Sequence, residues 1–133
     1  MRISPCYCIT LRNAANLISK IYDNHLEPFD LTIRQYSLLI NVGRLGSANI
    51  TTLSDHTNLD RTSLVRMLRP LLKKELIEDT AGNGKRDRNI RLTDNGRLLL
   101  AKAAPAWQLA QDEIEIKLGK ENLNNLMEIF KML

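Results

Sequence analysis

The chain has 133 residues, of which 44% are hydrophobic and 26% are charged, and its formal net charge is +4. This composition is ordinary for a globular protein and excludes a disordered or fibrous chain. The length suffices for one hydrophobic core and is short for two independent domains. Charged residues interrupt every apolar run before it reaches the roughly 18 residues of a membrane span, and Arg12 interrupts any signal-peptide core, so we expect a cytoplasmic protein without a membrane partner.

The first part of the sequence predicts three helices. Apolar residues recur at three- and four-residue steps over about residues 9–26, and Pro28 ends that helix. A second helix is expected to begin after an N-cap at Thr32 and to stop at Gly46, where a left-handed backbone costs glycine little. A short third helix is expected at about residues 51–57.

A helix-turn-helix is predicted at the end of the third helix. Asn58 lies where the chain must reverse, and asparagine tolerates a positive φ better than most residues. Asp60 is suited to cap the next helix by accepting the amides of Thr62 and Ser63, and Pro70 limits the regular hydrogen bonding of that helix. At about 100° per residue the helix has two faces. The face expected to pack holds Leu64, Leu68, Leu71 and Leu72, and the opposite face holds Arg61, Thr62, Arg66, Arg69 and Lys73.

A β-hairpin is predicted after this helix. Residues 76–78 and 89–92 are strand-sized runs that flank a glycine-containing tip at residues 82–88. Thr93 is then expected to cap a long helix.

Two helices are predicted at the C-terminal end. The first carries Pro105, where the loss of a backbone donor predicts a kink, and it ends at Gly119. The second extends from about Lys120 to Leu133 and has more apolar surface than one short helix needs to dock on its own subunit. We therefore expect the two ends of the chain to form a homodimer interface.

The net positive charge is concentrated in residues 60–91. That segment has nine Lys or Arg and five Asp or Glu, whereas the rest of the chain has ten of each. A cationic helix face is usually only a solvated surface. Here the face follows a helix-turn-helix spacing, begins at a cap and leads to a hairpin with a basic tip, which together favour binding to double-stranded DNA. The candidate DNA-binding residues are Arg61, Thr62, Ser63, Arg66, Arg69, Lys73, Lys85, Arg86 and Arg88.

Several motifs resemble the MarR family of bacterial transcription regulators. Residues 60–64 (Asp-Arg-Thr-Ser-Leu), followed by residues 69–71 (Arg-Pro-Leu), are similar to the family's recognition helix. Residues 86–96 are similar to its wing and to the Leu-Thr-x-x-Gly signature that follows, and residues 104–107 (Ala-Pro-Ala-Trp) fit one branch of the family. The resemblance extends over nearly the whole chain.

The resemblance implies a mainly α winged helix-turn-helix fold in a single chain. Residues 31–97 would form the DNA-binding lobe, and residues 1–30 and 98–133 the dimerisation helices. It further implies a homodimeric transcriptional regulator that binds a palindromic operator as a repressor. The repressor would be released by a small lipophilic or phenolic effector or by thiol oxidation.

The resemblance also assigns a role to the wing. It makes Arg86 the residue that reaches the minor groove, with Lys85 and Arg88 beside it. Many members of the family place an acid two residues before this arginine, to orient it. Here that position is Gly84, which leaves Asp87 for the task.

Two cysteines, Cys6 and Cys8, are too few for a secreted disulfide framework. Cys8 lies 14 residues before Tyr22, and a reactive cysteine and an activating tyrosine are similarly placed in the hydroperoxide-sensing branch of the family. Cys8 is therefore the first candidate redox sensor and Cys6 the second, and the thiolate of Cys8 would be stabilised by the helix N-terminus, by Arg12 or by a tyrosine hydroxyl. The branch's second tyrosine is replaced by Ile33, and the alternative is that both cysteines only pack near a helix start.

The sequence does not predict an enzyme. Residues 82–85 lack the full spacing of a phosphate-binding loop, and His25 and His56 show no metal-ligand spacing, so we expect no cofactor and no metal. Four side chains are available to line an effector pocket, although core packing explains each of them as well. They are Tyr22, His25, Tyr36 and Trp107.

A protein-interaction module is the alternative to a DNA-binding regulator. In that case the basic face would meet an acidic protein partner and would have no preference for a DNA sequence.

Overall fold

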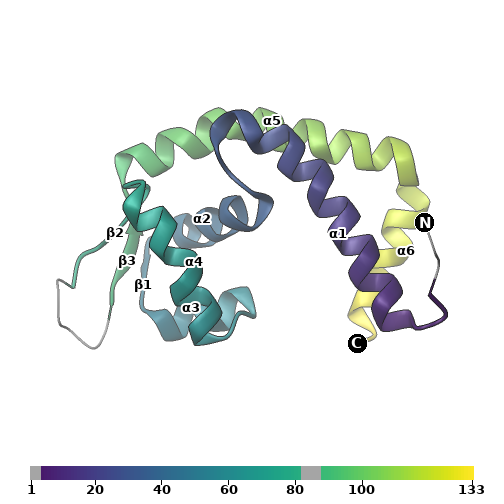
Figure 1. Cartoon of the computed structure of the whole chain (residues 1–133), viewed down its shortest axis with the longest axis horizontal. Helices are drawn as coiled ribbons and strands as arrows, with labels where there is room; N and C mark the ends of the chain where they lie inside the picture. The colour runs from purple at the N-terminus through teal and green to yellow at the C-terminus, as the bar shows by residue number, and fades with distance from the viewer. Residues whose placement is uncertain (1–3, 82–87) are drawn as a thin grey trace. The chain divides into compact units, whose positions relative to one another are not determined.

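The computed structural model describes residues 4–81 and 88–133. It is mainly helical and contains one small antiparallel sheet, which confirms the predicted fold class (Figure 1). The chain divides into two compact units. One consists of residues 1–30 and 105–133, and the other of residues 31–104.

The first unit is helical throughout its described elements. These are α1 (Tyr7–Leu26), the one-turn 3-10 helix η1 (Glu27–Phe29), the second part of α5 (Asp94–Leu118) and α6 (Lys120–Lys131). Pro28 lies in η1 and ends the α-helical hydrogen bonding as predicted. α5 remains one helix through Pro105. Gly119 separates α5 from α6 with a φ of 81°, a conformation that glycine adopts without strain.

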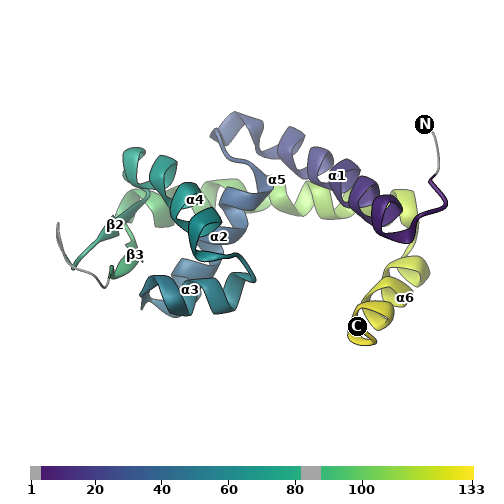
Figure 2. The same cartoon turned by 60° about the horizontal axis from the view of Figure 1, so that its bottom comes forward.

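Polar pairs join α1 to the second part of α5. The hydroxyl of Tyr22 donates a hydrogen bond to the side-chain oxygen of Gln111. One turn further, Nε2 of His25 lies 3.2 Å from Oε1 of Glu113. Both pairs are partly buried, and they fix the alignment of the two helices, which Figure 2 shows beside each other.

The second unit contains three helices, three strands and the first part of α5. The elements are α2 (Ile33–Leu45), β1 (Ser47–Ala48), α3 (Ile50–Thr57), α4 (Arg61–Lys73), β2 (Ile77–Asp79) and β3 (Ile90–Leu92). The predicted cap of α2 is confirmed, because Oγ1 of Thr32 accepts from the amide of Gln35 at 3.2 Å while the Gln35 side chain accepts from the amide of Thr32 at 3.1 Å. Gly46 follows α2 with a φ of 76°.

The sheet has the strand order β1, β3, β2 and is antiparallel throughout. Ile77 pairs with Leu92 and Asp79 with Ile90, so β2 begins one residue later than predicted. The reason is that Leu76 closes the C-terminal cap of α4, since its amide donates to the carbonyl of Leu71 at 3.0 Å. β1 was not predicted, because two residues are too few to show a periodicity.

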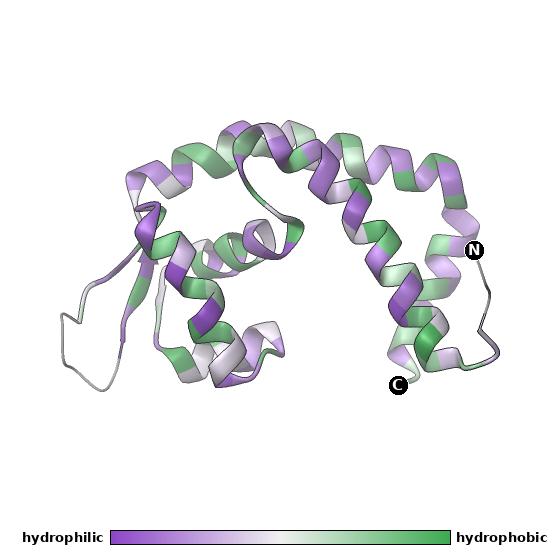
Figure 3. Cartoon of the chain, viewed as in Figure 1, coloured by the Kyte–Doolittle hydropathy of each residue, from purple (hydrophilic) through white to green (hydrophobic). Residues whose placement is uncertain are grey.

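The core of the second unit is aliphatic. α4 contributes three leucines that are completely buried, and hydrophobic residues alternate with hydrophilic ones along its ribbon in Figure 3. The largest fully buried side chains of this unit are Leu38, Leu39, Val42, Leu53, Leu64, Leu68, Leu71, Ile77 and Ile90. They hold α2, α3, α4 and the sheet together, and thereby fix which face of α4 is exposed.

Candidate nucleic-acid interface

The turn between α3 and α4 is held by local hydrogen bonds. Asn58 has a φ of 53°, as predicted for the residue at which the chain reverses. The hydroxyl of Ser54 donates to the carbonyl oxygen of Leu59 at 2.5 Å, across the turn. These two features set the direction in which α4 leaves α3.

Asp60 caps α4. Its Oδ1 accepts from the amide of Ser63 at 2.7 Å, and its Oδ2 accepts from the Ser63 hydroxyl at 3.1 Å. These two bonds, with smaller contributions from the amide of Thr62 and the charge of Arg66, lower the pKa of the Asp60 carboxyl below its ordinary value. The carboxylate is thus ionised at neutral pH and complements the positive end of the helix dipole.

α4 presents its predicted polar residues to solvent. Arg61, Thr62, Arg66, Arg69 and Lys73 are exposed, whereas Ser63 is half-buried and bonded to Asp60. Within residues 4–81 and 88–133, no carboxylate lies within salt-bridge distance of these four basic side chains. Leu64, Leu68 and Leu71 are completely buried on the opposite face, although Leu72 is only half-buried. The helix continues to Lys73 despite Pro70.

The base of the predicted wing is organised by Asp79. Its Oδ1 accepts the amides of Ala81 and Asn89, each at 3.0 Å, and so links the two strands next to the hairpin tip. Nε of the candidate residue Arg88 lies 3.9 Å from Oδ2 of Asp79. The other proposed wing residues, Lys85 and Arg86, lie outside the described part of the chain, as do Gly84 and Asp87.

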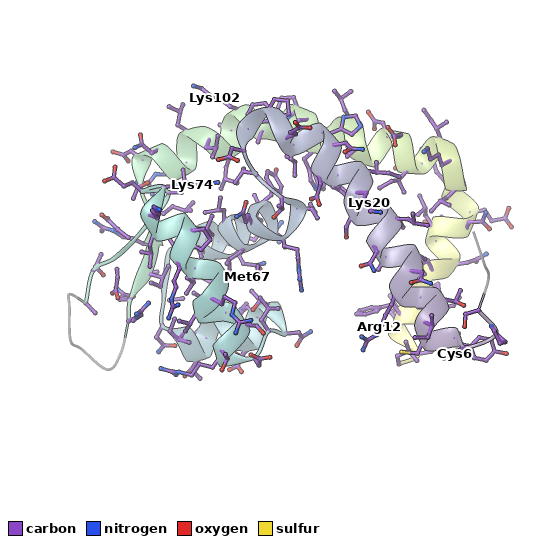
Figure 4. All side chains as sticks on the ribbon, in the orientation of Figure 1. Cys6, Arg12, Lys20, Met67, Lys74 and Lys102 are labelled. Carbon is purple, nitrogen blue, oxygen red and sulfur yellow. The ribbon has the colours of Figure 1, made fainter. Side chains whose placement is uncertain are left out.

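Both cysteines are free and exposed at the N-terminal end of α1. Cys6 precedes the first helical residue, and Figure 4 shows it at the same end of the helix as Arg12. Cys8 and Tyr22 are 14 residues apart on α1, which corresponds to about 21 Å of helix rise. Since the Tyr22 hydroxyl also donates to Gln111, Tyr22 of the same chain does not donate to Cys8.

The candidate pocket residues are distributed over both units. Tyr22, His25 and Trp107 belong to the unit with α1, and Tyr36 to the unit with α2. Burial raises the pKa of Tyr22 and of Tyr36 above the ordinary value. His25 is paired with Glu113.

Within residues 4–81 and 88–133, no three His, Cys, Asp or Glu side chains are grouped closely enough to hold a metal ion. The helices of these residues include none with the length and apolar character needed to cross a bilayer.

Sequence reasoning missed two features of this surface. Val65 lies among the polar residues of α4 and lines a hollow with them, but its hydrophobic character excluded it from the candidate residues. The bridging role of Asp79 was missed as well. The signal for it was an aspartate just before a turn, because Asp side chains often accept nearby backbone amides.

Comparisons with known proteins agree on one family. The family model described as "MarR family" matches residues 31–84. The uncharacterized HTH-type transcriptional regulator YhbI of Bacillus subtilis is 31% identical over 111 residues, which cover 83% of this chain and 72% of YhbI.

Solved structures have the same fold. The transcriptional regulator MosR of M. tuberculosis, crystallised in complex with DNA, matches with a TM-score of 0.77 and 31% identity over 96% of this chain and 97% of that one. The transcriptional repressor CouR, bound to a 23-mer DNA duplex, matches with a TM-score of 0.83 and 22% identity over 99% of this chain and 98% of that one. At this identity the match shows a common fold and no more. From the family model and the identity to YhbI and MosR, we conclude that this chain belongs to the MarR family.

Proposed function

We propose that this protein is a transcriptional regulator that binds double-stranded DNA in a sequence-specific manner. The proposal rests on α4, whose exposed face carries Arg61, Arg66 and Arg69 opposite its buried leucines and directly after a helix-turn-helix. The structural neighbour MosR, crystallised in complex with DNA and 31% identical to this chain, supports it. A helix of about 10 Å diameter fits the major groove of B-DNA, where arginine side chains can bind guanine in a bidentate manner.

The proposed unit of binding is a homodimer. The unit that contains α1 and α6 exposes large hydrophobic side chains, among them Ile116 at 85%, Met127 at 62% and Phe130 at 75%. A hollow of about 520 Å³ in the same unit is lined by apolar side chains of α1, α5 and α6 and, among the described residues, by the charged side chains of Lys20 and Lys117. Large exposed apolar patches are uncommon on monomeric proteins, and a second copy would cover these side chains.

Dimer symmetry determines the DNA that would be recognised. Two copies of α4 would enter successive major grooves about 34 Å apart, and two wings would reach the flanking minor grooves. The matching operator is a palindrome, and a dimer bound to it would repress transcription by occluding a promoter. The site of action would be the cytoplasm, where free thiols such as those of Cys6 and Cys8 persist.

Release from DNA is proposed to follow binding of a small lipophilic or phenolic effector, or oxidation of Cys8. The candidate effector residues Tyr22, His25, Tyr36 and Trp107 are aromatic or partly apolar and thus suit such a ligand. Cys8 is exposed and therefore accessible to an oxidant.

Selection of bound duplexes from a random-sequence DNA library tests the proposal. We expect one palindrome to be enriched and to bind several kcal/mol more tightly than random duplex in fluorescence-anisotropy titrations. Sedimentation of the complex should give two chains per duplex. Equal binding of all sequences, together with tight binding to an acidic polypeptide, would instead support the protein-interaction module.

A further inference from the structure

The exposed face of α4 is not uniformly polar. A hollow of about 300 Å³ on it is lined by one apolar and four polar or cationic side chains. The apolar one is half-buried Val65, and the others are Arg61, Thr62, Arg66 and Arg69.

Helix geometry places Val65 in the middle of this group. Arg61 lies four residues before it and Arg69 four residues after it, so both are its neighbours on the helix surface. Thr62 lies three residues before it on the same side. Any structure that fills the hollow must therefore approach Val65 while the arginines surround it.

The chemistry of Val65 differs from that of its neighbours. Valine has no hydrogen-bond donor or acceptor in its side chain, and its β-branching holds its methyl groups in one preferred rotamer in a helix. Of the groups that base pairs present in the major groove, the C5-methyl of thymine is the apolar one. A cytosine at the same place would present an amino group for which Val65 offers no acceptor, and an unsatisfied polar group is costly.

We propose that Val65 is a specificity-determining residue that contacts the C5-methyl group of a thymine in each operator half-site. This inference rests on the proposed function, since it requires α4 to lie in the major groove. In this arrangement Arg61 and Arg69, one helical turn before and after Val65, bind guanines or phosphates on either side, and Val65 selects a thymine between them.

Replacement of thymine by deoxyuridine provides the test, because it removes the methyl group and nothing else. In the duplex selected from the random-sequence library, each thymine position of the half-site is replaced in turn, symmetrically in both half-sites. At one position we expect the native protein to lose affinity about fourfold per half-site, or about fifteenfold for the dimer, the loss that corresponds to one buried methyl group per half-site. Val65→Ala, which leaves one methyl group that reaches less far, is expected to lose most of the difference in affinity between the thymine and deoxyuridine duplexes. Alanine is a good helix former, and thermal unfolding checks that this variant is folded.

Three results would overturn the proposal. In the first, the native protein binds every deoxyuridine duplex as tightly as the parent duplex, so that sequence-specific binding stands but Val65 does not read a methyl group. In the second, Val65→Ala keeps the native sensitivity to deoxyuridine. In the third, no sequence is preferred at all, and the proposed function fails together with the role of Val65.

Discussion

A side-chain carbon on Gly96 would lie 2.0 Å from the backbone carbonyl oxygen of Leu76. The same oxygen accepts the amide of Thr93 at 3.1 Å, while the Thr93 hydroxyl accepts the amide of Gly96 at 3.0 Å. The Leu-Thr-x-x-Gly signature is therefore a structural device, in which threonine caps α5 and glycine allows α5 to approach the end of α4.

Gly96→Ala should consequently destabilise the fold by about 3 kcal/mol or more, since a backbone oxygen cannot move aside as a side chain can. Gly43→Ala, in α2, is the matched control. Its new carbon would lie 2.9 Å from Cδ1 of Leu92, which is the end of a side chain and can move. We expect the control to change stability by less than about 1 kcal/mol. Urea unfolding measures both, and similar values for the two variants would contradict the steric explanation.

Asp60 should make the stability of the fold depend on pH in the acidic range. Its pKa is lowered in the folded state from the usual 3.8, so its stabilising effect is fully present above that value and is lost as the pH falls through the lower folded value. Asp60→Asn can still accept the Ser63 amide but does not titrate. The free energy of unfolding, measured by circular dichroism between pH 2 and pH 6, should therefore depend more steeply on pH for the native protein than for this variant. Parallel pH profiles would refute the role of the carboxylate charge.

Removal of one arginine from α4 should change both affinity and base preference. Arg66→Ala or Arg69→Ala is expected to weaken operator binding by about 1 to 3 kcal/mol and to relax the preference at one position. Lys85→Ala should weaken binding to all DNA sequences similarly. It should also reduce, by about one, the slope with which the logarithm of the binding constant falls with the logarithm of the salt concentration. Anisotropy titrations at two salt concentrations distinguish these patterns. Lys102→Ala, which removes an exposed charge from α5, is the control and should leave base preference unchanged.

Asp79→Ala should weaken DNA binding even though it makes the protein more positive. The carboxylate of Asp79 holds the amides of Ala81 and Asn89 where the two strand segments of the wing end, and its loss would leave both amides without this acceptor. We expect a loss of about tenfold in operator affinity, equivalent to one hydrogen bond of about 1.4 kcal/mol. Glu78→Ala removes the same charge from the same strand but breaks only the surface pair with Arg91. If both variants bind equally well, Asp79 does not position the wing.

Oxidation is expected to act through Cys8. In the presence of an organic hydroperoxide, the native protein and Cys6→Ser should lose affinity for the operator, whereas Cys8→Ser should retain it. Operator binding before and after a thiol reductant measures the effect and its reversal. Retention of DNA by the oxidised native protein would show that the two cysteines are not a sensor.

Much of the fold and part of the candidate site were readable from the sequence. The caps at Thr32, Asp60 and Thr93 and the reversal at Asn58 were predicted because each depends on hydrogen bonds or dihedral angles within a few residues. The separation of α4 into buried and exposed faces was predicted for a similar reason, since it follows from helical periodicity alone.

Contacts between distant segments were decided only by the tertiary structure. β1 exists because Ser47 and Ala48 pair with Arg91 and Ile90, more than 40 residues away in the sequence. Val65 has the polarity of a core residue, and only the packing of its neighbouring leucines leaves it beside the arginines of the exposed hollow. Residue identity and spacing thus determined the local hydrogen-bonded elements. Burial, strand pairing and close approach of the backbone depend on which distant segments come together, and the sequence pattern does not show this.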